Sequence, residues 1–194
     1  MAQSNPRFGR MIVAMVTPFD ADLELDLDRV QEFADRLILG GNDAIIVNGT
    51  TGESPTVFYP QKMDLFRAVV EAAAGRVPII ANVGDNCTAD TVSFAKDVQP
   101  LGVDGFMCVV PYYNKPPQEG LYQHFRTIAE TVELPIILYN VPSRTGVSFT
   151  AETYKVLSQN PKINGVKEAS GNFSLLAHTR FLCGDDFYIW SGND

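Results

Sequence analysis

The amino-acid sequence predicts an α/β fold in which parallel strands alternate with helices, and three observations support this prediction. Short apolar runs rich in β-forming residues recur along the chain and begin about every 30 residues, the length of one βαβ unit. The runs are continuously apolar instead of alternating, as expected for parallel strands that are covered on both faces. The segments between them carry apolar residues at helical spacing.

The elements follow one another regularly in the chain. The predicted strands cover residues 11–16, 44–47, 78–83, 105–110, 135–141, 163–167 and 187–190. Two of the helical segments show clear apolar stripes, formed by Leu27, Val30, Phe33, Ala34, Leu37 and Ile38 in the first and by Leu65, Phe66, Val69, Val70 and Ala73 in the second. Prolines mark several joins, at Pro60, Pro78, Pro135 and Pro161.

Seven strands that alternate with six helices fit either a doubly wound sheet or a TIM (β/α)8 barrel. A doubly wound nucleotide-binding fold needs a glycine-rich turn after its first strand, but here that strand leads into "TPFDADLELD". The barrel is therefore favoured. A complete barrel typically takes about 250 residues. We expect residues 1–194 to form a partial barrel domain, truncated after the seventh strand.

Composition and charge exclude several functional classes. With 45% apolar and 20% charged residues, the chain has the composition of a globular protein, and its net charge of −8 argues against nucleic acid or an anionic membrane as partner. The first apolar run is too short to cross a membrane. The three cysteines are odd in number and far apart, which favours reduced thiols in the cytosol over disulfides or a zinc site.

The active site of such a barrel is built at the carboxyl ends of the strands. The second predicted strand is followed by "NGTTGES", residues 48–54, where glycines and hydroxyls suit an anion. A tight turn without function is the alternative at Gly49, Thr50 and Thr51. The fourth strand is followed by "PYYNKPP", residues 111–117, whose tyrosines are interface anchors, proton carriers or simple packing groups.

The fifth and sixth strands end in groups that suit carbonyl chemistry. "YNVPSRTG", residues 139–146, places the phenol of Tyr139 at a strand end and Arg144 five residues later, where it either holds a carboxylate or forms an ordinary salt bridge. Among the six lysines, Lys167 in "GVKEASGN" alone follows a strand core directly. Desolvation there lowers the pKa of an amine below about 10.4 and frees it to attack a carbonyl. A lysine that snorkels from a strand end is the alternative.

Together, "GTTGES", "PYYNKP", "YNVPSRTG" and "VKEASGN" resemble the dihydrodipicolinate synthase family, within the class I pyruvate-dependent aldolases. The resemblance extends from about Met11 to Asp194. It implies that Lys167 forms a Schiff base with pyruvate and that Tyr139 donates and accepts protons, in a relay with Thr50 and Tyr113.

The resemblance also implies the substrate contacts and the activity. Thr51 holds the carboxylate of pyruvate with neighbouring backbone groups, among them Gly49, and Arg144 receives the carboxylate of L-aspartate 4-semialdehyde. The expected product is 4-hydroxy-tetrahydrodipicolinate, in the diaminopimelate route to lysine in the cytoplasm. No metal or organic cofactor is expected, because the lysine itself acts as electron sink.

A homo-oligomer is also implied, either a dimer or a dimer of dimers, in which Tyr113 serves the site of the neighbouring subunit. The family continues through an eighth barrel unit and a C-terminal helical region, both of which we expect to be absent from this chain.

Two alternatives remain open at this stage. N-acetylneuraminate lyase and the keto-deoxy-sugar aldolases resemble the same pattern at Lys167, Tyr139 and the threonine loop, and Arg144 is the residue that favours the synthase over them. A protein that folds and pairs with a partner without any chemistry is the second alternative, although the intact motifs count against it.

Overall fold

The structure is a computed structural model that describes residues 6–193, and it contains every strand that the sequence predicts. The strands are β1 Ile12–Ala14, β2 Ala44–Val47, β3 Ile79–Asn82, β4 Gly105–Val109, β5 Ile136–Asn140, β6 Ile163–Glu168 and β7 Tyr188–Ser191. The α-helices are α1 Leu27–Leu39, α2 Tyr59–Ala73, α3 Thr88–Val98, α4 Gln118–Thr131, α5 Pro142–Thr145, α6 Ala151–Leu157 and α7 Phe173–Cys183. Two 3-10 helices, η1 Ser54–Thr56 and η2 Gln99–Leu101, complete the described elements.

The strands follow one another in chain order, from β1 to β7. This order is the order of a (β/α)8 barrel, whereas a doubly wound sheet reverses direction at a switch point. The predicted barrel topology, with seven of its strands, is therefore confirmed. Within the described residues, no helix is long and apolar enough to cross a membrane.

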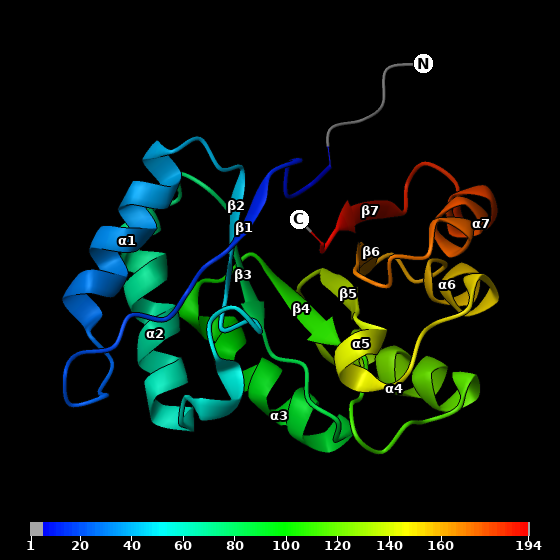
Figure 1. Cartoon of the computed structure of the whole chain (residues 1–194), viewed down its shortest axis with the longest axis horizontal. Helices are drawn as coiled ribbons and strands as arrows, with labels where there is room; N and C mark the ends of the chain where they lie inside the picture. Colours follow the sequence, from blue (N-terminus) through cyan, green and yellow to red (C-terminus); the bar gives the residue numbers. More distant parts are fainter. Residues whose placement is uncertain (1–5, 194) are drawn as a thin grey trace. The chain divides into compact units, whose positions relative to one another are not determined.

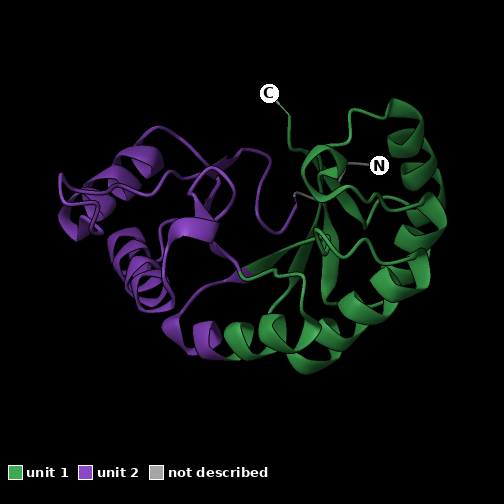
Figure 2. Cartoon of the chain, turned by 60° about the horizontal axis from the view of Figure 1, so that its bottom comes forward, with its two compact units in different colours: residues 1–3, 83–96, 106–194 green, residues 4–82, 97–105 purple. Residues whose placement is uncertain are grey.

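The chain divides into two compact units (Figure 2). Within the described residues, the first unit in chain order (purple, keyed as unit 2 in Figure 2) comprises residues 6–82 and 97–105, and the second (green, keyed as unit 1) comprises residues 83–96 and 106–193. The expectation that residues 1–194 form one partial barrel domain stays a prediction.

The first unit places three parallel strands beside two packed helices (Figure 1). All residues of β2 and β3 are buried, as the continuous apolar runs predict. Helix α1 begins where the Asp26 side chain accepts a hydrogen bond from the backbone N–H of Arg29, at 3.1 Å. The predicted stripe of α2 faces the interior, since Leu65, Phe66 and Val69 are buried.

The second unit holds β4 to β7, whose pairings are parallel, together with α4, α6 and α7 (Figure 1). Its core contains a row of aromatic rings. The ring centroids of Phe125 and Phe149 lie 5.4 Å apart, those of Phe149 and Tyr154 lie 4.6 Å apart, and those of Tyr154 and Phe187 lie 5.8 Å apart. Such tilted contacts stabilise the packing beyond the area that they bury.

His124 falls in the helical segment "GLYQHFRTIAE", which predicts a residue at the surface or boundary of a helix, but the structure places it in the core. It lies on α4 and is only 5% exposed. Its Nδ1 lies 2.8 Å from Thr88 Oγ1, and burial lowers the pKa of the imidazole to about 4. The ring is thus a neutral part of the core.

Candidate active site

Lys167 and Tyr139 lie opposite each other at the ends of two neighbouring strands. They are register partners in the parallel pairing of β5 with β6, so their side chains leave the same face of the sheet. The Lys167 Nζ lies 4.8 Å from the centroid of the Tyr139 ring, and Tyr139 is only 5% exposed. The geometry brings an amine and a phenol together at a largely buried position, as the sequence predicts.

The strand on the other side of β6 shapes the space around the lysine. Trp190 on β7 is the register partner of Lys167. A Cβ atom at Gly192 would lie 3.0 Å from Lys167 Cγ and 2.9 Å from Ala169 Cβ. Glycine at this position therefore leaves room for the lysine side chain, and we expect a larger residue there to displace it.

The threonine loop after β2, residues 48–54, lies in the first unit. Thr50 and Thr51 are exposed, and their backbone amides donate no hydrogen bond within residues 6–193, so the loop has unused backbone donors. Gly52 packs against the chain so closely that a Cβ would lie 3.0 Å from the Met15 carbonyl oxygen. The hydroxyl of Thr17 donates to the Gly52 carbonyl at 2.6 Å and holds the loop in place.

Two asparagines brace the start of this loop. The amide of Asn48 donates to the Asn82 carbonyl at 3.0 Å, and the amide of Asn82 donates to the Asn48 carbonyl at 2.9 Å. Asn48 adopts a left-handed backbone conformation with φ of 61°. The reciprocal bonds join the ends of β2 and β3 and stabilise a conformation that non-glycine residues rarely adopt.

Arg144 lies on α5, the short helix that follows β5. The sequence pattern does not predict this helix, which begins at Pro142 and ends before Gly146, a residue whose φ is 72°. The side chain of Arg144 is exposed, and no carboxylate forms an ion pair with it in the described part of the chain. An ordinary loop salt bridge is therefore not what occupies this guanidinium.

The two adjacent tyrosines of the loop after β4 behave differently. The Tyr112 hydroxyl donates to Asp85 Oδ2 at 3.1 Å, and burial together with the Asp85 charge raises the pKa of Tyr112. Tyr113 is 90% exposed and adopts a φ of 72°. Its hydroxyl has no hydrogen-bond partner within residues 6–193. Tyr113 thus combines a strained backbone with an almost fully exposed phenol.

Within the second unit, Lys167 and Tyr139 are in contact, and Gly49, Thr50 and Thr51 lie in a loop of the first unit. Their roles, and those of Tyr113 and Arg144, stay predictions. Among the described residues, no three His, Cys, Asp or Glu side chains gather into a metal site.

A polar cluster that the predicted site does not include lies directly behind Lys167. Glu168 is buried and accepts hydrogen bonds from the side chains of Asn140 and Tyr154. The sequence does carry a signal for this cluster. A charged residue next to Lys167 on a buried strand faces the opposite, covered side of the sheet and needs polar partners there.

A model of the dihydrodipicolinate synthetase family matches residues 7–194. The chain belongs to this family. Similar curated relatives of this family include 4-hydroxy-tetrahydrodipicolinate synthase 1 of Halalkalibacterium halodurans, which is 50% identical over 96% of this chain and 63% of its own length. The synthase of Synechococcus elongatus is 47% identical over 100% of this chain and 65% of its own length.

Solved structures of the dihydrodipicolinate synthetase family agree with the fold. A dihydrodipicolinate synthase from Bacillus anthracis superposes with a TM-score of 0.95 at 43% identity, over 97% of this chain and 65% of its own. The synthase from Cyanidioschyzon merolae, solved with lysine bound, also gives 0.95, at 45% identity over 97% of this chain and 65% of its own. The chain therefore spans slightly less than two thirds of the length of each of these relatives.

Proposed function

We propose that the protein acts as a 4-hydroxy-tetrahydrodipicolinate synthase, a lyase that condenses pyruvate with L-aspartate 4-semialdehyde. The observation that carries this proposal is the pair at the ends of β5 and β6, where the Lys167 amine lies 4.8 Å from the centre of the Tyr139 ring. A shielded amine beside a proton-transfer group is what imine chemistry requires. Membership of the family supports the same assignment.

The reaction then follows from these two groups. The unprotonated Lys167 amine adds to the C2 carbonyl of pyruvate, and Tyr139 gives a proton to the departing hydroxyl, so that water leaves and an imine forms. The resulting Tyr139 phenolate takes a methyl proton from the protonated imine and produces an enamine. The enamine carbon attacks the aldehyde of the second substrate, and the Tyr139 phenol gives a proton to the alkoxide that forms. The amino group of that substrate closes the ring by attacking the imine carbon, which releases Lys167 as a free amine.

The remaining predicted residues bind and relay in this scheme. Thr51, with Gly49 and neighbouring backbone amides, holds the carboxylate of pyruvate, which the unused donors of the threonine loop support. Thr50 passes protons to and from Tyr139 with the help of Tyr113. Arg144 receives the carboxylate of the semialdehyde, and its lack of an ion pair within residues 6–193 supports this role.

A direct assay tests the proposed function. The purified protein is incubated with pyruvate and L-aspartate 4-semialdehyde, and in parallel with sialic acid. We expect condensation in the first reaction and no cleavage in the second. Cleavage of sialic acid without condensation would assign the protein to the sugar-lyase branch of the superfamily instead.

Replacing Arg144 with alanine is expected to raise the KM for the semialdehyde far more than the KM for pyruvate. A hydrogen bond to a charged group contributes about 1.5–3 kcal/mol, so the KM for the semialdehyde should rise roughly 10-fold to 100-fold. The measurement is steady-state kinetics with each substrate varied in turn.

The matched control for Arg144 is Arg126→Ala on α4, because Arg126 pairs with Glu130 at 2.7 Å on an exposed helix face. Neither KM should change in this control, since exposed pairs of this kind contribute little. Equal increases in both KM values for Arg144→Ala would contradict the proposed role and indicate a structural one.

We also propose that the active protein is a homo-oligomer, a dimer or a dimer of dimers, in which Tyr113 serves the site of a neighbouring copy. The exposure of Tyr113, 90%, and the absence of a hydrogen-bond partner within residues 6–193 support this proposal. An exposed aromatic side chain on a strained backbone is typical of a group that is buried in a partner.

Mixing two inactive variants tests the shared site. Tyr113→Phe retains Lys167, and Lys167→Ala retains Tyr113, so a hybrid dimer contains one complete site. After subunit exchange at equal amounts, we expect recovery of about one quarter of the wild-type activity, because half of the dimers are hybrids and each has one working site. If exchange is demonstrated by mass and no activity returns, each site is built from one chain.

The cytoplasm is the compartment that we propose for this reaction, within the diaminopimelate route to lysine. All three cysteines are free, and burial raises the pKa of the Cys108 thiol to about 12, which leaves it protonated and unreactive. Free thiols suit a reducing compartment.

A further inference from the structure

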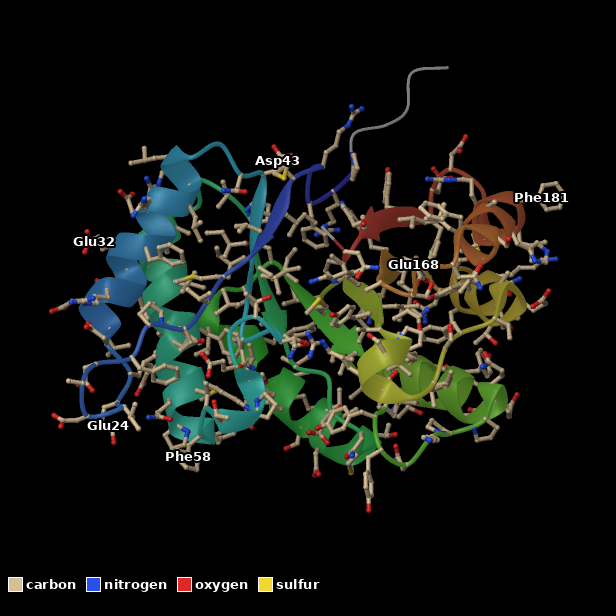
Figure 3. All side chains as sticks on the ribbon, viewed as in Figure 1. Glu24, Glu32, Asp43, Phe58, Glu168 and Phe181 are labelled. Atoms are coloured by element: carbon tan, nitrogen blue, oxygen red, sulfur yellow. The ribbon has the colours of Figure 1, made fainter. Side chains whose placement is uncertain are left out.

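A buried carboxylate lies directly behind the lysine of the proposed site. Glu168 is the last residue of β6 and is only 7% exposed (labelled in Figure 3). Since successive residues of a strand face opposite sides of the sheet, its side chain leaves the face opposite to that of Lys167. Burying a carboxylate is costly unless hydrogen bonds compensate for the lost water, so its surroundings indicate what the group does.

Every donor to Glu168 comes from a different part of the second unit. The Asn140 amide on β5 donates to both carboxylate oxygens, at 3.0 Å and 3.1 Å. The Tyr154 hydroxyl on α6 donates to Oε2 at 2.8 Å, and the Ser170 backbone N–H, just after β6, donates to Oε1 at 2.9 Å. No lysine or arginine forms an ion pair with Glu168 among residues 6–193. Neutral donors alone satisfy this carboxylate.

Each of these donors is itself held rigidly. The Tyr154 ring packs between Phe149, 4.6 Å away, and Phe187, 5.8 Å away, and burial first and then the Glu168 charge raise the pKa of its hydroxyl well above the usual value. Tyr154 therefore stays protonated and donates. The Asn140 Nδ2 also donates to Ser148 Oγ at 3.1 Å, and the backbone carbonyl of Asn140 accepts from the Ala169 N–H at 2.8 Å.

Asn140 and Glu168 form the register pair next to the one that carries the proposed chemistry. Asn140 pairs with Glu168 in the register of β5 and β6, and their predecessors Tyr139 and Lys167 form the adjacent pair on the other face. A shift of one strand against the other would break the two Asn140–Glu168 bonds and displace the phenol from the amine at the same time. Misplacement of reacting groups by as little as about 1 Å costs orders of magnitude in rate.

We propose that Glu168 is a positioning residue, whose buried carboxylate fixes the Lys167 amine against the Tyr139 phenol by locking Asn140, Tyr154 and the Ser170 backbone around the end of β6. This proposal rests on the proposed Schiff-base function, because it concerns the geometry of that reaction. Glu168 does not touch a substrate, and it acts through the two side chains on the opposite face.

Glu168→Gln is the variant that tests the role of the carboxylate. It keeps the shape of the side chain but turns one acceptor into a donor that faces the Asn140 amide. The readout is kcat per trapped site, which is kcat divided by the fraction of protein in which pyruvate and borohydride form a Lys167 adduct. Unfolded molecules form no adduct and therefore do not lower this value. We expect kcat per trapped site to fall about 10-fold to 100-fold, because an unsatisfied buried group distorts the pair, while the KM for pyruvate stays within about threefold.

Rescue distinguishes positioning from general damage. In the double variant Asn140→Asp with Glu168→Gln, the glutamine NH2 donates to the new carboxylate, and the glutamine oxygen accepts from the Ser170 N–H. The Tyr154 hydroxyl can rotate and accept from the same NH2 group, so it also keeps a partner. We expect kcat per trapped site to return to within about threefold of wild type, since the donor and acceptor pattern is restored. No recovery in a folded double variant, or an unchanged kcat per trapped site in Glu168→Gln, overturns the proposal.

A milder variant covers the case in which Glu168→Gln does not fold. Tyr154→Phe removes one donor and leaves the others, and kcat per trapped site should fall about 3-fold to 10-fold. Tyr59→Phe is its matched control, because it removes a tyrosine–carboxylate bond to Asp97, 2.8 Å long, in the first unit. Equal kcat per trapped site in both variants overturns the proposal, whereas failure of the wild-type protein to form any adduct refutes the proposed function itself.

Discussion

Replacing Lys167 with alanine is expected to abolish turnover and to remove the pyruvate adduct entirely. Without the amine no imine forms, and the methyl group of pyruvate keeps its ordinary weak acidity. The rate should fall on the order of 10⁴-fold or more, because only substrate binding and the remaining polar groups still contribute. Lys167 lies at a strand end and is only partly buried, so the fold should tolerate the change.

Mass mapping after reduction with borohydride checks this prediction. The wild-type protein should carry Nε-(1-carboxyethyl)lysine at residue 167 and at no other lysine. Lys155→Ala is the matched control, because Lys155 lies exposed on α6 and its removal should change neither adduct nor rate. An adduct on another lysine, or full turnover in Lys167→Ala, would show that the imine is formed elsewhere or not at all.

Replacing Tyr139 with phenylalanine is expected to lower kcat about 10²-fold to 10⁴-fold, the range that one positioned proton-transfer group contributes. The ring remains and continues to fill its buried position beneath the Lys167 amine, so packing and stability change little. The adduct should still be trapped, although more slowly, because Lys167 keeps its amine while the departing water loses its proton donor.

Stopped-flow trapping and steady-state rates separate these effects. Tyr122→Phe on the half-buried face of α4 is the control and should leave both rates unchanged. A loss smaller than about 10-fold in Tyr139→Phe would mean that another group transfers the proton. Complete loss of the adduct would mean instead that the phenol is needed to place the lysine.

Elements whose signal is local could be predicted from the sequence. The runs at 44–47 and 78–83 are apolar over their whole length, and β2 and β3 are fully buried strands. The stripe around Leu65 and Val69 likewise predicted the buried face of α2. Lys167 and Tyr139 could be placed at neighbouring strand ends because parallel strands in chain order bring their carboxyl ends to one edge.

Short or polar features were harder to predict. Helix α5 has only four residues, which is too few for a periodic pattern, and its proline reads equally well as part of a loop. His124 sits among polar residues in "YQHFRT", so its sequence neighbours suggest a surface position. Its burial depends on Thr88, which lies 36 positions away along the chain.

What the sequence alone determined is therefore the order of the elements, the buried faces of the long ones and the residue types at the strand ends. Only the tertiary structure decided the partners of Glu168, since Asn140 and Tyr154 lie 28 and 14 positions away from it and reach it from a different strand and a helix. The physical reason is that periodicity arises from a residue's immediate neighbours, whereas a buried carboxylate is satisfied only by donors that folding brings from distant parts of the chain.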